Sequence, residues 1–254
     1  MNLLLTRRRV LLAAAAAGTA SLSACVTRPN LTDMPPIVFV HGNGDTAGLW
    51  MATIWRFESN GWPRDRLHAI DLPYPLARDD DAKEQPGRSS TGEFTNHLAA
   101  EVKKVLAATG AAKVALVGLS RGGYAIRNFI ASGGASVVSH AVLGGVPNHG
   151  VWANPGFLPG SEFNGAGPFL VKLNAPQGAA GNEVTPGVAW LTIRSDNNDK
   201  YAQPDGVWLG ARGTPTNVSF DGPALKGAEN VVIAGNLEVG LDHLFRIGLG
   251  FLAT

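Results

Sequence analysis

The stretch KVALVGLSRGGYAIRNFIAS, residues 113–132, decides the fold of this chain. Its apolar run Val114–Val117 predicts a strand, GLSRG at 118–122 predicts a tight turn, and the helical spacing over 124–130 predicts a helix. The glycines that end the turn fit this arrangement, because a side chain at either place would collide with the crossing backbone. Strand, G-x-S-x-G turn and helix together indicate a nucleophile elbow, which holds the Ser120 hydroxyl clear of the sheet.

The five-residue pattern alone is weak, because the chain has 32 glycines and such a pattern arises easily by chance. The strand before it, the helix after it and the extra Gly123 supply the context that the motif requires. The alternative is a glycine-rich strand-to-helix turn in which Ser120 has no chemical role.

Composition limits the classes of protein that this chain can belong to. With 254 residues, 45% of them hydrophobic, it is long enough for one domain with a full-sized core. A net charge of +1 gives no sign of a nucleic-acid partner. The single cysteine, Cys25, excludes an internal disulfide and a multi-cysteine zinc site. Asp79-Asp80-Asp81 could bind a cation but is interpreted as a solvated loop, so no metal is expected. No G-x-G-x-x-G motif follows a strand, so no dinucleotide cofactor is expected either.

Strands alternate with helices along the chain. Further strands are predicted at Ile37–Val40, Leu67–Ile70, Val137–Leu143, Val188–Ile193 and Asn230–Ala234, and helices at Leu49–Ser59, from Thr91 or Gly92 through Leu106, and at Asp242–Leu252. This order predicts an α/β domain over residues 37–254, with a mostly parallel sheet covered on both faces. Residues 151–186, rich in glycine, proline and asparagine, are expected to form a short cap-like insertion over the elbow.

The first 25 residues have the pattern of an export signal. Arg7-Arg8-Arg9 precedes a short apolar stretch, and the surrounding sequence resembles a twin-arginine signal, although plain secretory signals also carry arginines. Leu22-Ser23-Ala24-Cys25 resembles a bacterial lipobox, in which the cysteine is acylated. The alternative is an ordinary cleaved signal in which the cysteine occurs by chance. A polar linker at 26–36 follows. We therefore expect an exported envelope lipoprotein, on the periplasmic side or in the outer membrane, that is held to the membrane if Cys25 is acylated.

A serine nucleophile needs a base, and the expected chain order is serine, acid, histidine. His243, at the junction of the last strand and the last helix, is the expected base. His149 follows the next strand and is interpreted as a cap or cleft residue, while His41 is interpreted as a structural hydrogen-bonding residue. The acid should follow the strand Val188–Ile193, so both Asp199 and Asp196 qualify.

Asp199 is preferred over Asp196 because it lies deeper in that loop and is followed by Tyr201 and Pro204. Two backbone N–H groups should form the oxyanion hole, one from Arg121 and one from Asn43 in the loop after the first strand. The Arg121 side chain has two interpretations: it stabilises acidic products, or it pairs with a nearby carboxylate.

The chain resembles the class 2 lipase family of small bacterial α/β hydrolases. The resemblance rests on VFVHGNG at 38–44, GWPRDRLHAIDLP at 61–73, TGAAKVALVGLSRGG at 109–123, VLGGVPN at 142–148 and GAENVVIAGN at 227–236. It implies an α/β-hydrolase fold with a small or absent lid, and hydrolysis of carboxylic esters without a cofactor. The chain departs from the family at Leu119, where the family often has histidine, and in the length of the insertion 151–186.

We therefore expect an exported serine esterase or lipase that acts on a lipid-like or polyester substrate through an acyl-enzyme on Ser120. A polyester depolymerase or an amidase would use the same triad. A different class of function is a non-catalytic envelope lipoprotein that keeps the hydrolase scaffold as a binding module, since a fold does not guarantee its chemistry.

Overall fold

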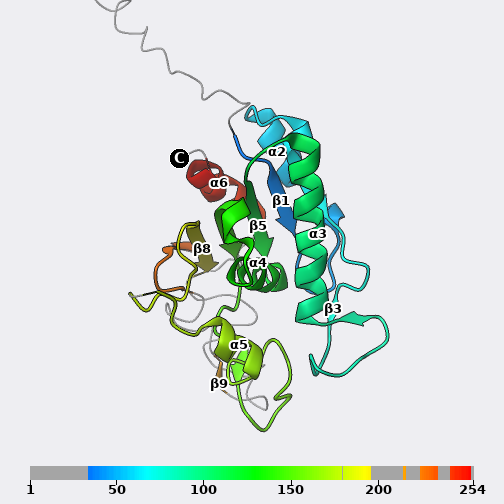
Figure 1. The fold of residues 1–254 in the computed structure, drawn as a ribbon, viewed down its shortest axis with the longest axis vertical. Coiled ribbons are helices and arrows are strands. Elements are labelled where there is room, and N and C mark those ends of the chain that lie inside the picture. The colour runs from blue at the N-terminus through cyan, green and yellow to red at the C-terminus, as the bar shows by residue number, and fades with distance from the viewer. Residues whose placement is uncertain (1–33, 179, 196–213, 216–223, 234–240, 253–254) are drawn as a thin grey trace, which may run out of the picture. The chain divides into compact units, whose positions relative to one another are not determined.

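The computed structural model describes residues 34–178, 180–195, 214–215, 224–233 and 241–252 (Figure 1). Six parallel strands form the central sheet in the order β10-β8-β6-β5-β1-β2. Their bounds are β1 Ile37–Val40, β2 Leu67–Ile70, β5 Val114–Leu119, β6 Val138–Gly144, β8 Ala189–Ser195 and β10 Glu229–Ile233. The expected mostly parallel α/β sheet is thus confirmed, with each predicted strand displaced by no more than two residues at either end.

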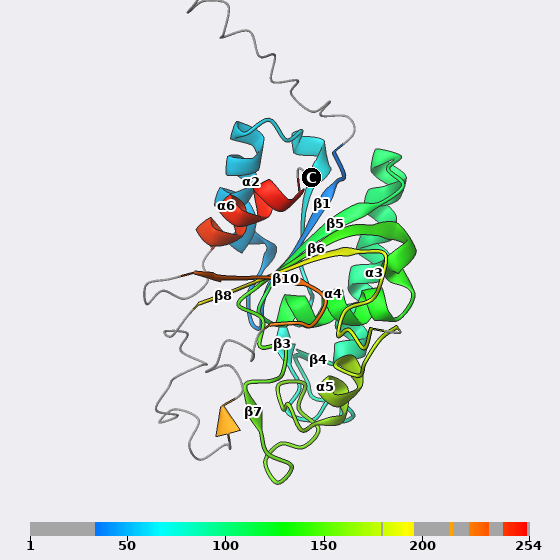
Figure 2. The same ribbon diagram turned by 90° about the vertical axis from the view of Figure 1, so that its left-hand side faces the viewer.

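Helices cover both faces of the sheet, because the buried strands carry apolar side chains on both sides. In β1, Ile37 and Phe39 pack with α2 (Met51–Ser59) and α6 (Leu241–Leu252), while Val38 and Val40 join the core under α3 and α4. Figure 2 shows α2 and α6 on one side of the sheet and α3 and α4 on the other. The alternation of side chains along each strand produces these two apolar cores.

The long helix α3 (Thr91–Thr109) begins and ends at residues suited to helix termini. The Ser90 hydroxyl accepts a hydrogen bond from the Glu93 N–H, and the Glu93 carboxylate accepts one from the Ser90 N–H, which together form a capping box. Gly110 ends the helix in the left-handed conformation, at φ 67°. A capping interaction of this kind stabilises a helix by about 1 kcal/mol. Apolar side chains of α3 and of α4 (Arg121–Ala131) belong to the same core on this face of the sheet.

Short elements gather beyond the edge at which the parallel strands end. They are β3 (Leu76–Ala77), β4 (Arg88–Ser89), β7 (Trp152–Ala153), β9 (Thr214–Pro215) and α5 (Pro168–Leu173). Three 3-10 turns lie elsewhere in the chain, at Ala47–Trp50, Arg64–Arg66 and Gly134–Val137. Figure 1 shows β3 and α5 beyond the ends of β1 and β5. Binding sites of parallel α/β sheets lie at this carboxyl edge, so these segments are on the side of the sheet where the site is expected.

No helix among the described residues combines the length and the apolar character needed to cross a bilayer.

Candidate functional site

Ser120 lies between β5 and α4 in a strained backbone conformation. Its φ is 50° and its ψ is −124°, a combination that residues with a Cβ rarely adopt. The strain is held by packing, because the Ser120 N–H donates to the Gly144 carbonyl of β6 at 3.0 Å and α4 starts at the next residue. Backbone strain of this size is found mainly at functional sites, where the surrounding structure over-determines it.

Two glycines allow the chain to turn this sharply. A Cβ on Gly122 would lie 2.4 Å from the Val40 carbonyl oxygen and 2.7 Å from that of His41. A Cβ on Gly118 would lie 2.6 Å from Cδ1 of Ile126. The close approach of α4 to the end of β1 therefore requires glycine at 122, while Gly118 leaves room for the first turn and the Ile126 side chain of α4.

The loop after β1 reaches Ser120 directly. A Cβ built on Gly42 would lie only 3.3 Å from the Ser120 Cβ. Asn43 follows, and within the part of the chain that the structure describes no acceptor takes up its backbone N–H. Arg121 is the first residue of α4, where a backbone N–H has no partner inside the helix. Among the residues that the structure describes, neither of these two N–H groups has a hydrogen-bond acceptor, so both are available as donors near Ser120. An oxyanion hole needs two backbone donors of this kind.

The Arg121 side chain pairs with a carboxylate, which decides between the two interpretations of this residue. Its Nε donates to Glu162 Oε1 at 2.5 Å and its Nη2 donates to Glu162 Oε2 at 3.1 Å. Both side chains are buried, Arg121 at 0% exposure and Glu162 at 1%. Burial raises the pKa of the Glu162 carboxyl, and the Arg121 guanidinium works against that rise.

Glu162 was not predicted from the sequence as a site residue. It is one of two acids, with Glu183, in an insertion dominated by glycine, proline and asparagine. The only sequence signal is that an isolated acid in such a segment can serve a buried cation. Nothing in the local pattern says that this cation is Arg121.

β8, which precedes the expected acid, ends at the same edge of the sheet at which α6, which carries the expected base, begins. Leu244 packs so closely on Gly144 that a Cβ there would lie 2.5 Å from Leu244 Cδ2. His243 lies in the first turn of α6 and directly precedes Leu244. Leu244 contacts Gly144, whose carbonyl accepts the Ser120 N–H. The side chain of His243 and all of Asp196 and Asp199, which follow β8 directly, lie outside the described residues, as does Cys25.

Two other histidines have partners of their own. His41 is buried and accepts the Leu72 N–H at its Nε2, 3.2 Å away, which agrees with a structural role. His149 Nε2 lies 2.7 Å from Glu183 Oε1, and the other carboxylate oxygen accepts the Lys226 N–H. Burial alone would raise the pKa of Glu183, but these hydrogen bonds outweigh it and hold the pKa below its ordinary value. His149 thus holds the loop after β6 to the segment around Glu183.

The three adjacent aspartates, Asp79 to Asp81, each have a partner. Asp79 bonds Gln85, Asp80 pairs with Lys83, and Asp81 accepts both the N–H and the hydroxyl of Thr91. Among the described residues, no three histidine, cysteine or acidic side chains gather as metal ligands would.

Known proteins share parts of this sequence. The sequence profile of the alpha/beta hydrolase family matches residues 37–236. A non-heme haloperoxidase from Rhodococcus erythropolis is 32% identical over 136 residues, 51% of this chain and 44% of that enzyme. The chain thus matches less than half the length of this curated relative.

Solved lipase structures share the fold. A Bacillus licheniformis lipase in its mature form superposes with a TM-score of 0.58 at 19% identity, covering 86% of this chain and 92% of that one. The propeptide form of that lipase superposes with a TM-score of 0.62 at 20% identity, covering 89% of this chain and 52% of that one. A monoacylglycerol lipase from Paleococcus ferrophilus superposes with a TM-score of 0.52 at 13% identity, covering 87% of this chain and 95% of that one. At these identities the likeness concerns the fold alone.

Proposed function

Since this chain belongs to the alpha/beta hydrolase family, we propose that it hydrolyses carboxylic esters through a covalent intermediate on Ser120. The observation that carries the proposal is the strained Ser120 at the carboxyl edge of the sheet, close to the loop of Asn43 and to the start of α4. The backbone N–H groups of Asn43 and Arg121 have no acceptor among the described residues. Acyl transfer needs a serine hydroxyl with backbone donors near it.

In the proposed reaction, Ser120 Oγ attacks the ester carbonyl carbon while His243 takes its proton. The carbonyl oxygen becomes an oxyanion that the N–H groups of Asn43 and Arg121 stabilise. When the tetrahedral intermediate collapses, the C–O bond of the ester breaks and His243 returns the proton to the leaving alcohol. Water then attacks the acyl-enzyme by the same route. Asp199, or Asp196 in its place, orients the imidazole and stabilises its charged form.

Apolar side chains beside the oxyanion loop support a lipid-like or polyester substrate. Tyr74 and Leu76 are 57% and 42% exposed. Leu76 lies beside Gly44, since a Cβ on that glycine would be 3.3 Å from Leu76 Cδ2. Large apolar groups exposed next to a reactive centre are suited to contact an apolar part of the substrate.

Labelling with a fluorophosphonate tests the proposed nucleophile. The folded wild-type protein should form one covalent adduct, and peptide mass spectrometry should place it on Ser120. Rates on triglycerides, short aryl esters, polyhydroxyalkanoate and aryl amides then distinguish a lipase or esterase from a polyester depolymerase or an amidase. A folded protein that neither takes up the label nor turns over any of these substrates would favour a non-catalytic lipoprotein instead.

We further propose that the protein is exported and anchored to the cell envelope through an acylated Cys25. The support is the arginine-rich start and the LSAC motif at 22–25, with the sole cysteine placed behind an apolar stretch. Intact-mass measurement of the mature protein should show a chain beginning at Cys25 with added acyl groups. A mature chain that begins elsewhere and carries no lipid would contradict the anchor.

A further inference from the structure

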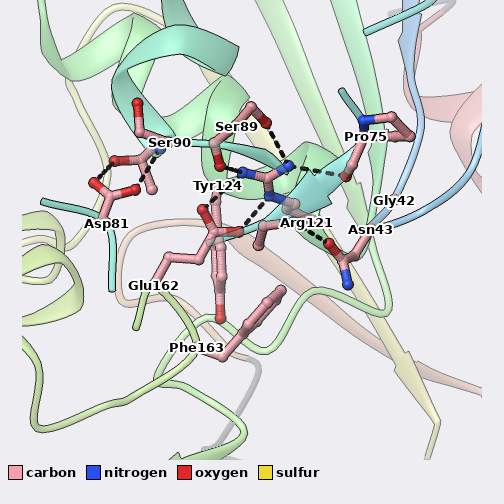
Figure 3. Close-up of polar contacts among 12 residues, drawn as sticks. Gly42, Asn43, Pro75, Asp81, Ser89, Ser90, Arg121, Tyr124, Glu162 and Phe163 are labelled. Carbon is pink, nitrogen blue, oxygen red and sulfur yellow. Dashed lines mark hydrogen bonds and ion pairs between the residues drawn. The ribbon is translucent and has the colours of Figure 1, made fainter. Parts of the chain in front are cut away.

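The guanidinium of Arg121 is enclosed by three segments that lie far apart in the sequence. Its five N–H groups all have acceptors. Nε and Nη2 each donate to one oxygen of the Glu162 carboxylate, and Nη2 also donates to the Ser89 carbonyl at 2.8 Å. Nη1 donates to Ser89 Oγ at 3.0 Å and to the Pro75 carbonyl at 2.9 Å. The ring of Phe94 lies under it, 5.1 Å from the guanidinium carbon. Figure 3 shows Glu162, Ser89 and Pro75 converging on this one side chain. A planar guanidinium whose N–H groups are all hydrogen-bonded has little freedom to move.

One of these acceptors also holds the loop that carries Asn43. The Pro75 carbonyl accepts the Gly44 N–H at 3.2 Å as well as Arg121 Nη1. Two residues on, the Ala77 N–H donates to the Asn43 side-chain oxygen at 2.7 Å. The segment 75–77 therefore connects the Asn43 loop to the Arg121 side chain.

Glu162 completes this arrangement from the insertion. Its carboxylate supplies the negative charge that the buried guanidinium needs, because a cation without a partner is strongly disfavoured in the interior. The neighbouring contact between the Asp81 N–H and the Gly160 carbonyl, at 2.9 Å, holds the insertion to the loop before α3. The position of Arg121 thus depends on a residue 41 positions away in the sequence.

We propose that the Arg121–Glu162 ion pair positions the oxyanion hole by holding the Asn43 loop at a fixed place relative to the first N–H of α4. The proposal rests on the ester hydrolysis proposed above. The Arg121 guanidinium and Glu162 are positioning groups, whereas the backbone N–H groups of Asn43 and Arg121 touch the reacting oxygen. A donor displaced by about 1 Å can cost about 100-fold in rate, so a loosened loop should affect the transition state far more than substrate binding.

Glu162→Gln tests the ion pair with little change of shape. On a short aryl ester we expect kcat to fall by about 10- to 100-fold while KM stays within about threefold, because the missing interaction acts in the transition state. A boronic acid, which forms a tetrahedral adduct on serine, should bind more weakly by a comparable factor. Glu162→Asp keeps the charge and should recover part of kcat.

The matched control is Glu183→Gln, the same change at the other acid of the insertion. The partners of its carboxylate are His149 and the Lys226 N–H, and within the described part of the chain no hydrogen bond or ion pair joins it to the Asn43 loop. This variant should keep kcat within about twofold and bind the boronic acid as the wild type does. Equal losses of kcat in the two variants, or a folded Glu162→Gln with unchanged kcat, would overturn the proposal.

Ser89→Ala keeps the proposal testable if Glu162→Gln does not fold. It removes only the hydroxyl that accepts Arg121 Nη1 and leaves the ion pair in place. We expect a fall in kcat of about two- to tenfold with KM unchanged, and an unchanged kcat would count against positioning. The wild type separates the two proposals: an inactive wild type overturns both, whereas an active wild type with an insensitive Glu162 and Ser89 overturns only the positioning role.

Discussion

Replacing Ser120 by alanine should lower kcat/KM on a reactive ester by about 10⁴-fold or more while the protein remains folded. The hydroxyl is the only group of the protein that forms a bond to the acyl carbon in the proposed mechanism. Without it, the two oxyanion donors retain only the residual rate that binding and electrostatic stabilisation supply. Hydrolysis of a p-nitrophenyl ester, together with loss of fluorophosphonate labelling, measures the effect.

Ser132→Ala is the matched control, because Ser132 follows the other end of the same helix and is exposed. It should leave both rate and labelling unchanged. A Ser120→Ala protein that hydrolyses the ester within tenfold of the wild type would show that Ser120 is not the nucleophile. The activity would then have to come from another group.

A second substitution at Ser120 separates chemistry from stability. Alanine keeps a Cβ at φ 50°, whereas glycine removes it. Relief of strain at such a position is worth about 1–3 kcal/mol, so Ser120→Gly should unfold at a higher urea concentration than Ser120→Ala although both are inactive. If the two variants unfolded at the same urea concentration, the turn at Ser120 would store no backbone strain.

The sheet was predictable from the sequence because each strand is a short apolar run with turn residues on both sides. Val114–Val117 and Leu67–Ile70 are buried on one or both faces, and their patterns carry that information locally. The start of α4 was predicted too late, at Tyr124 rather than Arg121. Gly122 and Gly123 are poor helix formers, so local propensity conceals a helix start that tertiary contacts with β1 and Val146 impose.

The site was predictable in part for a related reason. The turn around Ser120 has a sequence signature because its geometry excludes side chains locally. The partner of Arg121 has no such signature, since Glu162 is brought to it by an insertion without periodicity and by contacts that run through Pro75 and Ser89. The sequence allowed the Arg121 side chain either to stabilise acidic products or to pair with a carboxylate, and only the fold shows the pairing with Glu162. For His243, Asp196 and Asp199 the interpretation stays a prediction.

The largest effect on stability is expected from Gly122→Ala. The added Cβ would lie 2.4 Å from the Val40 carbonyl oxygen and 2.7 Å from that of His41, and real Cβ atoms essentially never come closer than 3.0 Å. Both neighbours are backbone atoms at the end of β1, which is paired with β2 on one side and β5 on the other. Neither can yield as a flexible side chain would. We expect a loss of about 4 kcal/mol or more, a large fraction of the 5–15 kcal/mol that stabilises a typical domain.

Gly250→Ala gives the matched control for Gly122→Ala. Gly250 is exposed in α6 and nothing lies within 4 Å of the place where its Cβ would be. The same added methyl group should there stabilise the protein by about 0.5–1 kcal/mol, since alanine favours helix over glycine. Urea unfolding followed by circular dichroism measures both, and a Gly122→Ala midpoint at or above that of the wild type would contradict the expectation.

Any Gly122→Ala protein that does fold has to move α4 away from the end of β1. That movement separates the first N–H of α4 from the Asn43 loop, because Gly42 and Ser120 approach each other at this same crossing. Such a variant should therefore label slowly with fluorophosphonate even at temperatures where it is fully folded. Labelling at the wild-type rate would mean that the crossing of α4 over β1 does not set the distance between the two oxyanion donors.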